Sequence, residues 1–423
     1  MHLVFSEVTI CFGAWETLEG KKPVPDNGNE LEDERSSRSF DLLYRIIVDP
    51  HFASVIRSME VHAYKVDGGR GAFEIRCLVI AIGFLRELSS FVWRGQHHYL
   101  PSGHRLLGAI MQVAPSSVRA FNSLCSISVS TTWPTYEDTI KDHSFTIARC
   151  TTAQENLHTL ELPFHSPADV PLKYLPKLTH LGLIVDMQTL NELGSVLRQL
   201  PRLRSLSIFL PSSQEDLLVT TLSLLHDDLP HLSSLTLQCH GSRILQVHHT
   251  EMLASFLRDR RSLRRLYCNL KVPQECLSLY LNAIRTMKDM EIFDLELTQP
   301  FTAEFIENLL SHLPVGLAAM RLTSQRLLSD AAVFSQFWTY FTDLQYLYIR
   351  TWEATDVKAE AIIKGTSSLQ LLGYNGHLYD VEYPYGKPAL LPPWSARKVA
   401  FRNAHDFGCE GWEWLMRRLT IKP

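Results

Sequence analysis

The stretch LPRLRSLSI, residues 200–208, ends in the pattern L-x-x-L-x-L, with apolar residues at Leu203, Leu206 and Ile208. The alternation of Leu206 and Ile208 with polar neighbours has period two, which is typical of a half-buried β-strand. The same pattern recurs along almost the whole chain, with other apolar residues often in place of leucine. Its copies begin at Ile56, Leu88, Leu124, Leu157, Leu178, Leu203, Leu232, Leu263, Met290, Leu317, Leu344, Leu369 and, more weakly, Ala396. A recurrence of this kind predicts an array of stacked repeats.

Between two copies of the pattern the apolar period changes to that of a helix. Leu190, Leu193 and Leu197 lie on one helical face, and Thr250 and Thr302 precede similar apolar runs as candidate N-cap residues. Strand and helix units with right-handed crossovers stack their strands in parallel. We therefore expect an α/β, leucine-rich-repeat-like solenoid with parallel strands on its concave face and helices on its convex face. Its repeats are irregular, about 21–36 residues long.

The composition suits such an array. The 423 residues exceed the size of one compact core, and 45% of them are hydrophobic and 20% charged. A net charge of −4 gives no electrostatic footprint for nucleic acid or for an anionic membrane surface, so neither is an expected partner. The eight cysteines lack a C-x-x-C pair and are expected to be reduced, and no secretory signal precedes them. We expect an intracellular protein, cytoplasmic or nuclear.

Two segments interrupt the repeat pattern. Residues 16–39 are rich in charge, proline and glycine and are expected to form a flexible linker between an N-terminal strand segment, residues 1–15, and a solenoid over residues 40–423. Its serines at 36, 37 and 39 are alternatively phosphorylation sites, with a solvated insertion the favoured interpretation. Residues 376–394 are rich in proline and tyrosine and are expected to be a long loop, followed by a C-terminal capping helix.

Three phrases of this sequence resemble the degenerate leucine-rich-repeat proteins of basidiomycete fungi, many of them F-box-like. They are LPKLTHLGL, LPRLRSLSI and LPHLSSLTL, at residues 175–183, 200–208 and 229–237, and DPHFASVIRSMEV at residues 49–61 is similar to that family's first repeat. The resemblance covers residues 40–419 and implies a role in recognising ubiquitin-ligase substrates. An F-box itself is not visible, because the segment LVFSEVTI at residues 3–10 resembles the part that directly follows it in that family.

No catalytic, cofactor or metal motif has the required spacing. The pairs His97–His98 and His248–His249 could ligate zinc only if further ligands converged on them, so we expect no metal site. Residues 68–71, GGRG, are expected to be a turn before a helix, although their amides could alternatively meet a phosphate. The arginine-rich residues 258–265 are expected to be a solvated turn whose charges cap the preceding helix. We expect no enzymatic activity.

The third, fifth and seventh positions of each copy should point away from the core into the concave face. In early and middle repeats these positions are mostly serine, whereas in the last third they are tyrosine and charged residues. Tyrosine and arginine are over-represented in interface hot spots, although β-propensity alone also enriches tyrosine in strands. The predicted partner-binding residues are Arg265, Tyr267, Arg321, Tyr346, Tyr348 and Arg350, with Asp294 and Glu296 among them and Lys398 and Arg402 in the weak last copy.

The function expected from the sequence is a non-catalytic protein–protein interaction module that binds a protein partner on the concave face of its C-terminal repeats. One alternative is the substrate-recognition subunit of a cullin-RING ubiquitin ligase whose F-box is lost or truncated. Another is a hydrolase with an unrecognised site, which would need a nucleophile and a base in one pocket.

The F-box question leads to a first prediction. Because no F-box pattern is visible in the 423 residues, the chain is expected not to form a stoichiometric complex with the adaptor subunit of a cullin-RING ligase. Co-expression followed by size-exclusion chromatography measures this. A stable one-to-one complex with the adaptor would show that residues 1–40 have been misread.

Overall fold

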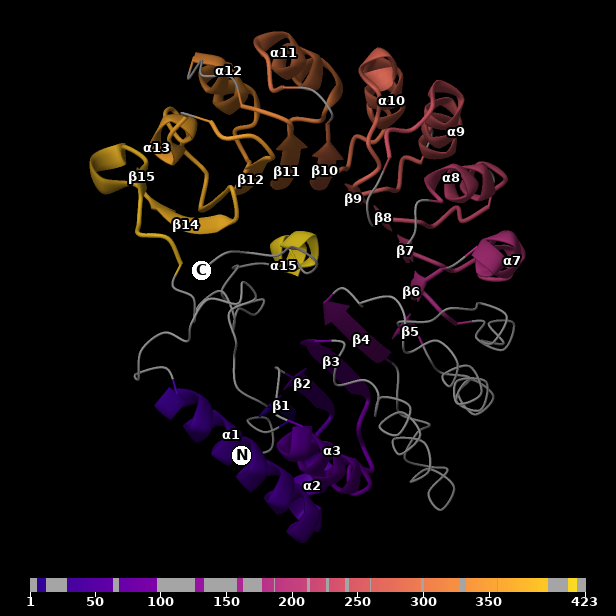
Figure 1. The fold of residues 1–423 in the computed structure, drawn as a ribbon, viewed down its shortest axis with the longest axis vertical. Coiled ribbons are helices and arrows are strands. Elements are labelled where there is room, and N and C mark those ends of the chain that lie inside the picture. Colours follow the sequence, from indigo (N-terminus) through magenta and orange to yellow (C-terminus); the bar gives the residue numbers. More distant parts are fainter. Residues whose placement is uncertain are drawn as a thin grey trace. The chain divides into compact units, whose positions relative to one another are not determined.

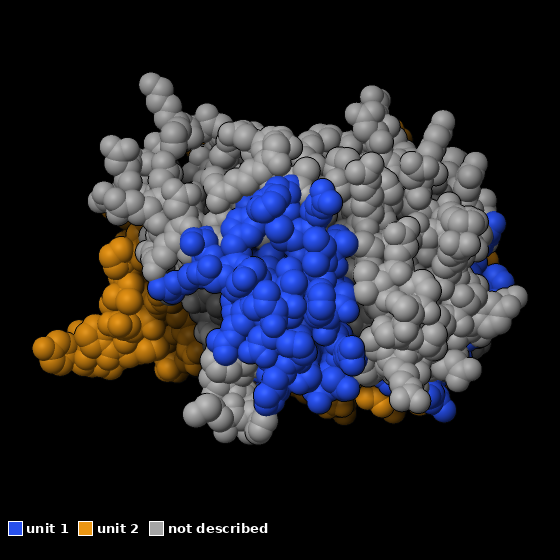
Figure 2. Space-filling model, turned by 90° about the horizontal axis from the view of Figure 1, so that it is seen from below, with its two compact units in different colours: residues 1–203 blue, residues 204–423 orange. Residues whose placement is uncertain are grey.

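The structure is a computed structural model. It describes residues 6–12, 29–63, 68–96, 126–132, 158–162, 177–185, 187–210, 214–225, 228–239, 243–258, 260–297, 300–327, 332–355, 357–394 and 410–416. The chain divides into two compact units, Met1–Leu203 and Arg204–Pro423, which Figure 2 colours separately. Each unit is described by itself below.

Unit 1 is a parallel sheet in which the strands follow the order of the sequence, from β1 to β6. The strands are β1 (Glu7–Phe12), β2 (Ser58–Ala63), β3 (Ser90–Gln96), β4 (Ser126–Thr132), β5 (Thr159–Leu162) and β6 (His180–Ile184). The described helices are α1 (Asn29–Val48), α2 (Pro50–Val55), α3 (Gly68–Ile82) and α7 (Met187–Arg198). Helix α7 buries Leu190, Leu193 and Leu197, which confirms the apolar stripe that predicted it.

Unit 2 repeats the same strand and helix alternation and ends in an antiparallel hairpin. Its strands are β7 (Ser205–Leu210), β8 (Ser234–Cys239), β9 (Arg265–Cys268), β10 (Ile292–Glu296), β11 (Ala319–Ser324), β12 (Tyr346–Thr351), β13 (Leu371–Tyr374), β14 (His377–Glu382) and β15 (Ala389–Leu390). Its described α-helices are α8 (Glu215–Ser223), α9 (Val247–Leu257), α10 (Leu277–Ile284), α11 (Ala303–His312), α12 (Ala332–Tyr340), α13 (Ala359–Ile362) and α15 (Glu410–Met416), with 3-10 turns η4 (Gln274–Cys276) and η5 (Pro384–Gly386). Strands β7 to β13 are parallel, and β13, β14 and β15 are antiparallel neighbours.

The pairing register aligns equivalent positions of the L-x-x-L-x-L pattern from one repeat to the next. Leu206 pairs with Leu235 and Leu235 with Leu266 at the fourth position, and Met320 pairs with Leu347 in the same way. All five side chains are fully buried. The helices α8 to α13 lie on one side of these strands (Figure 1), and the apolar positions fill the space between. The chain is thus the leucine-rich-repeat-like α/β solenoid that the sequence predicts.

Most of the described repeat strands are tied at their start to the preceding repeat by a shared carbonyl acceptor. The carbonyl of Ser233 accepts hydrogen bonds from the amides of Arg264 and Arg265, at 2.8 and 3.0 Å. The carbonyl of Arg57 in unit 1 accepts equivalent bonds from the amides of Ser89 and its neighbour Ser90. This arrangement gives the backbone groups at the strand ends partners without any side-chain ladder.

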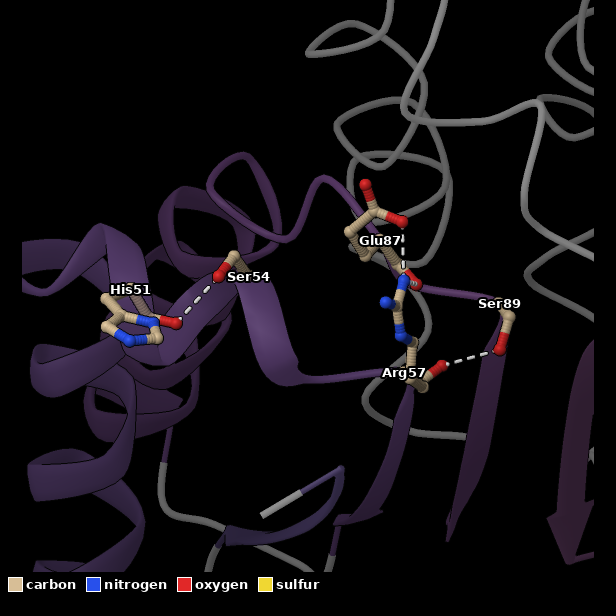
Figure 3. Close-up of polar contacts among 5 residues, drawn as sticks. All are labelled: His51, Ser54, Arg57, Glu87 and Ser89. Carbon is tan, nitrogen blue, oxygen red and sulfur yellow. Dashed lines mark hydrogen bonds and ion pairs between the residues drawn. The ribbon is translucent and has the colours of Figure 1, made fainter. Parts of the chain in front are cut away.

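Side chains reinforce this edge of unit 1 (Figure 3). The Ser89 hydroxyl donates to the Arg57 carbonyl at 2.9 Å, and the Arg57 guanidinium pairs with the Glu87 carboxylate. One turn earlier, the Ser54 hydroxyl donates to the carbonyl of His51 in α2 at 2.8 Å. Because the Arg57 and Glu87 side chains are both about half exposed, their ion pair contributes at most about 1 kcal/mol. The backbone bonds therefore set the register.

Two asparagines at the seventh position of their repeats satisfy the turn at the other end of the strands. The Asn269 side chain accepts from the Cys239 amide at 2.7 Å and donates to the Cys239 carbonyl at 2.9 Å. Asn375 accepts from the Thr351 amide at 2.8 Å in the same relationship to its preceding repeat. The sequence predicts that seventh positions face the concave side of the sheet, so the role of these two asparagines in the turn was not predicted.

The arginine-rich residues 258–265 do cap the preceding turns, but the cap is a buried side chain. Arg260 is 8% exposed and its guanidinium lies 4.0 Å from the centre of the Phe256 ring. Its Nε donates to the Phe256 carbonyl at 2.7 Å, and its two Nη atoms donate to the carbonyls of Leu225, Asp228 and Leu229 in the previous repeat. Leu229 has a positive φ of 61°, so this arginine holds a strained turn.

Several element boundaries differ from expectation. Residues 29–39, expected in the flexible linker, belong to α1, and the Ser39 hydroxyl accepts from the Cys11 amide at 2.9 Å, which makes it a structural group. Residues 68–71 form the first turn of α3 instead of a turn before it. The weak copy at Ala396, its Lys398 and Arg402, residues 13–28 and the pair His97–His98 lie outside the described residues.

Two further expectations concern helix starts and the last repeat. Thr302 is the N-cap of α11 and accepts from the Phe305 amide at 3.1 Å, as predicted. Thr250 lies inside α9, which begins at Val247, so the second predicted cap is wrong. Residues 376–394, expected to be a loop, contain the β14–β15 hairpin, because the prolines fall after β14 and outside its ladder.

The Arg260 arrangement makes a stability prediction. Arg260→Lys should lower the free energy of unfolding of unit 2 by about 2–4 kcal/mol, because lysine cannot reach carbonyls of two repeats with one ammonium group. Urea unfolding followed by tryptophan fluorescence measures the loss. The matched control is Arg261→Lys on the exposed neighbour, expected to stay within about 0.5 kcal/mol of the parent. Equal losses of stability from the two substitutions would show that the hydrogen bonds of Arg260 to two repeats do not stabilise unit 2.

Candidate functional site

The fifth positions of the last repeats form one row across the sheet of unit 2. Asp294 in β10 pairs with Arg321 in β11, Arg321 with Tyr348 in β12, and Tyr348 with Gly373 in β13. These side chains point to the face of the sheet opposite α8 to α13, called the inner face from here on. Parallel strands lie about 4.8 Å apart, so neighbours in the row are in contact distance. Tyr267 in β9 occupies the same position of its repeat.

A buried charge pair lies at the centre of this row. Arg321 Nη1 lies 3.1 Å from Asp294 Oδ1, and the two side chains are 4% and 0% exposed. The second carboxylate oxygen, Oδ2, accepts from the Cys268 amide at 3.2 Å, and the guanidinium carbon lies 4.9 Å from the centre of the Tyr267 ring. Burial raises the pKa of Asp294 to about 7, against the opposing effect of Arg321. The pair is therefore a proton-sensitive group held away from solvent.

Glycine at the end of the row makes room for a tyrosine ring. A Cβ atom on Gly373 would lie 2.0 Å from Cδ2 of Tyr348, so the Tyr348 ring rests directly against this backbone. No larger residue fits at position 373 unless the ring moves. Tyr346, two residues earlier in β12, donates its hydroxyl to Oε1 of Gln370 at 3.3 Å. Both tyrosines are thereby fixed in position.

A second polar group lies toward the carboxyl ends of the same strands. Lys271 Nζ is 3.9 Å from Glu296 Oε1 and 4.4 Å from the centre of the Trp352 ring. Burial raises the pKa of Glu296, while Arg321, Lys271 and Arg350 act to lower it. Arg350 is exposed and Trp352 is 45% exposed, so the carboxyl end of β12 faces solvent.

The inner face is covered by a helix of the same chain. Helix α15 contacts β10 and β11 and lies on the side of them opposite α10 and α11 (Figure 1). The Trp412 ring stacks on Tyr346, with centroids 4.9 Å apart and an angle of 20° between the planes. Trp412, Leu415 and Met416 are fully buried. They join one apolar cluster with Tyr267, Ile292, Ala319, Tyr346, Tyr348, Leu371, Leu378 and Trp394.

The six predicted partner-binding residues come from β9, β11 and β12, but most are not accessible. The buried members are Tyr267, Arg321, Tyr346 and Tyr348, each at most 4% exposed. Arg265 is half-buried and Arg350 is exposed. A partner can reach the four buried residues only if α15 leaves, so their role in binding stays a prediction.

The sequence predicts a C-terminal capping helix but not the surface on which it docks. The signal was present in WEWLM, residues 412–416, where Trp412, Leu415 and Met416 are spaced i, i+3, i+4 as on one face of a helix. The end of the parallel array carries the β14–β15 hairpin instead. Gly373 was also missed, because its importance depends on the cross-strand position of Tyr348.

The described residues contain no group of three His, Cys, Asp or Glu side chains that could hold a metal ion. His248 and His249 have ring centroids 3.7 Å apart, and His249 Nδ1 lies 2.7 Å from Asp216 Oδ1. The described cysteines, among them the buried Cys239 and Cys268, are free thiols. No described helix is long and apolar enough to cross a bilayer.

No family model matches the chain, and the search of curated proteins found no relative. Solved structures of similar fold include the yeast Rad7–Elc1 complex, at 14% identity and a TM-score of 0.44, over 84% of this chain and 83% of that one. They also include the leucine-rich-repeat-containing protein LegL7 of Legionella pneumophila, at 11% identity and a TM-score of 0.30, over 98% of this chain and 99% of that one. The functional domain of InlJ from Listeria monocytogenes matches at 12% identity and a TM-score of 0.28, over 77% of this chain and 64% of that one. Likenesses this low transfer neither a partner nor an activity, and the repeat fold rests on the strands and helices described above.

The buried pair predicts a dependence of stability on pH. In the folded chain Asp294 has a pKa of about 7, above its ordinary value of 3.8, so the folded state binds the proton more tightly and loses stability as pH rises from 4 to 7. The loss is on the order of 2–4 kcal/mol, at about 1.4 kcal/mol per pKa unit. Asp294→Asn should remove most of this loss and leave the smaller part that Glu296, whose pKa is also raised, contributes, as measured by urea unfolding between pH 4.5 and 7.5.

The control for this experiment is Asp289→Asn, on an exposed turn before β10, which should leave the pH dependence of the parent unchanged. If Asp294→Asn keeps the parental pH dependence, Asp294 does not titrate in this range.

Proposed function

We propose that this chain is a non-catalytic protein-interaction module and that the inner face of unit 2 binds a segment of a protein partner. The supporting observation is that this face already accommodates a peptide segment, because α15 packs its apolar side on it. The row of fifth positions includes Tyr267, Arg321 and Tyr348, and tyrosine and arginine are residue types that commonly anchor interfaces.

The surface has the mixed character of a recognition site. Its apolar part includes Tyr346 and Leu371, and its polar end includes Glu296, Lys271 and Arg350. An apolar centre with a charged rim is the usual anatomy of a protein interface. Because the rim contains both signs of charge, selection by paired charges is expected instead of bulk attraction.

The ubiquitin-ligase alternative depends on the resemblance described for the sequence. Nothing among the contacts of the inner face discriminates a ligase substrate from another protein partner. Formation of an adaptor complex in the test given above would favour that alternative independently of the inner face.

Site-specific photocrosslinking tests the proposed surface. A photoreactive phenylalanine in place of Arg350, at the exposed carboxyl end of β12, should crosslink to the partner, and the same replacement of Ser205 in β7 should not. Arg350→Ala should weaken the purified complex by about 2 kcal/mol if Arg350 is a central anchor, whereas Ser205→Ala should be nearly silent. Equal crosslinking or equal losses at the two positions would place the binding surface elsewhere.

A further inference from the structure

The arginine beneath α15 is buried but not fully hydrogen-bonded. Nε and Nη1 of Arg321 make no hydrogen bond, and neither does Asp294 Oδ1, although Nη1 and Oδ1 form an ion pair at 3.1 Å. The side chain of Tyr267 is a hydrogen-bond partner of the same guanidinium, so its hydrogen bonding is incomplete but not absent. A buried polar group without a partner costs about 1–3 kcal/mol, and more when it is charged. Among the described side chains of α15, none provides a hydrogen-bond acceptor for Nε or Nη1 of Arg321.

The charges around the site favour an acidic occupant. Arg321, Lys271 and Arg350 are arranged near two carboxyl groups, those of Asp294 and Glu296. The excess is one positive charge with both carboxyls ionised, and it grows when Asp294, with a pKa of about 7, takes up a proton. A carboxylate brought to Arg321 would form a charge-assisted hydrogen bond in a site of low dielectric constant.

The apolar contacts define the shape of the occupant. Helix α15 inserts Trp412 against Tyr346 and buries Leu415 and Met416 one turn later, a spacing of i, i+3, i+4. Its seven residues are too few to be helical alone in water, so the helix exists because it is docked. An occupant with the same three anchors and a longer helix loses less conformational entropy on binding.

From these observations we infer that the inner face of unit 2 recognises an amphipathic helical segment of a partner with an aromatic anchor followed by two aliphatic residues at i+3 and i+4. The segment also carries a carboxylate that reaches Arg321, and it competes with α15 for the same surface. This inference rests on the proposed function and specifies the chemistry of the partner. Helix α15 is then an intramolecular competitor that covers the surface when no partner is bound.

Fluorescence anisotropy with synthetic peptides tests the inference on the full chain. The base peptide has eighteen residues, keeps the 410–416 sequence at its centre and is extended with helix-forming residues. Two further peptides place Glu at the equivalents of Gly411 and Trp414, and a control peptide replaces the Trp412 equivalent by Ala. Each is titrated into the parent chain and into a chain carrying Trp412→Ala and Leu415→Ala, which weaken the docking of α15.

We expect the base peptide to bind the chain with the weakened α15 at least tenfold more tightly than the parent chain, and the control peptide to bind neither. At least one Glu peptide should bind this chain about tenfold more tightly than the base peptide does, which is the gain in affinity that one charge-assisted hydrogen bond allows. That gain should vanish when the chain also carries Asp294→Asn and Arg321→Met, a paired replacement that leaves neither partner of the buried pair alone and so preserves folding. Circular dichroism confirms that each variant is folded.

Each other outcome overturns a defined part of the inference. Binding of the base peptide without any gain from Glu rejects the acidic partner and leaves the proposed function standing. If no peptide binds the folded chain with the weakened α15, the helical partner is rejected. The crosslinking at Arg350 then tests the proposed function separately. A concentration-dependent dimer of the parent chain that Trp412→Ala abolishes identifies a second copy's α15 as the occupant and rejects a different partner.

Discussion

The in-register pairing of parallel repeat strands is the constraint on which the rest of unit 2 depends. Because each repeat meets the next at the same position, as Leu235 meets Leu266, every position of the repeat becomes a row across the sheet. The first, fourth and sixth rows form the core, and the fifth row presents its side chains together on the inner face. A substitution in one strand is therefore felt by the neighbours in its row, as the fit of Tyr348 against Gly373 shows.

The same constraint explains how much could be foreseen. Period and spacing alone predict the strands, because Leu206, Leu235, Leu266 and Leu347 can all be buried only in one parallel register. The stripe of Leu190, Leu193 and Leu197 predicts α7 for the same reason. The predicted row of tyrosine and charged residues also follows from register, and Asp294, Arg321 and Tyr348 do lie side by side.

What escaped prediction depends on contacts distant in sequence. Arg260 is one of five arginines in eight residues, and only the turn at Leu229 one repeat earlier decides that this one is buried. The roles of Asn269 and Gly373 are likewise set by the repeat beside them. Local pattern can show that a helix such as α15 is amphipathic, but not which surface receives its apolar side.

The docking of α15 on the inner face also buries the Asp294–Arg321 pair. Without a cover, Ile292, Ala319, Tyr346 and Leu371 would form an exposed apolar patch of the kind that soluble proteins rarely leave open. Covering that patch also removes water from the charge pair, and a desolvated ion pair repays the cost of burial only with complete hydrogen bonding. Because Nε and Nη1 of Arg321 make no hydrogen bond, the cost of desolvating the pair is only partly offset here. Because α15 is tethered to the surface that it covers, its local concentration is in the millimolar range or higher, and this keeps a weak cover in place. A partner in solution has no such tether, so it must gain its advantage from contacts that α15 lacks, and the Nε and Nη1 atoms of Arg321, which make no hydrogen bond, offer one.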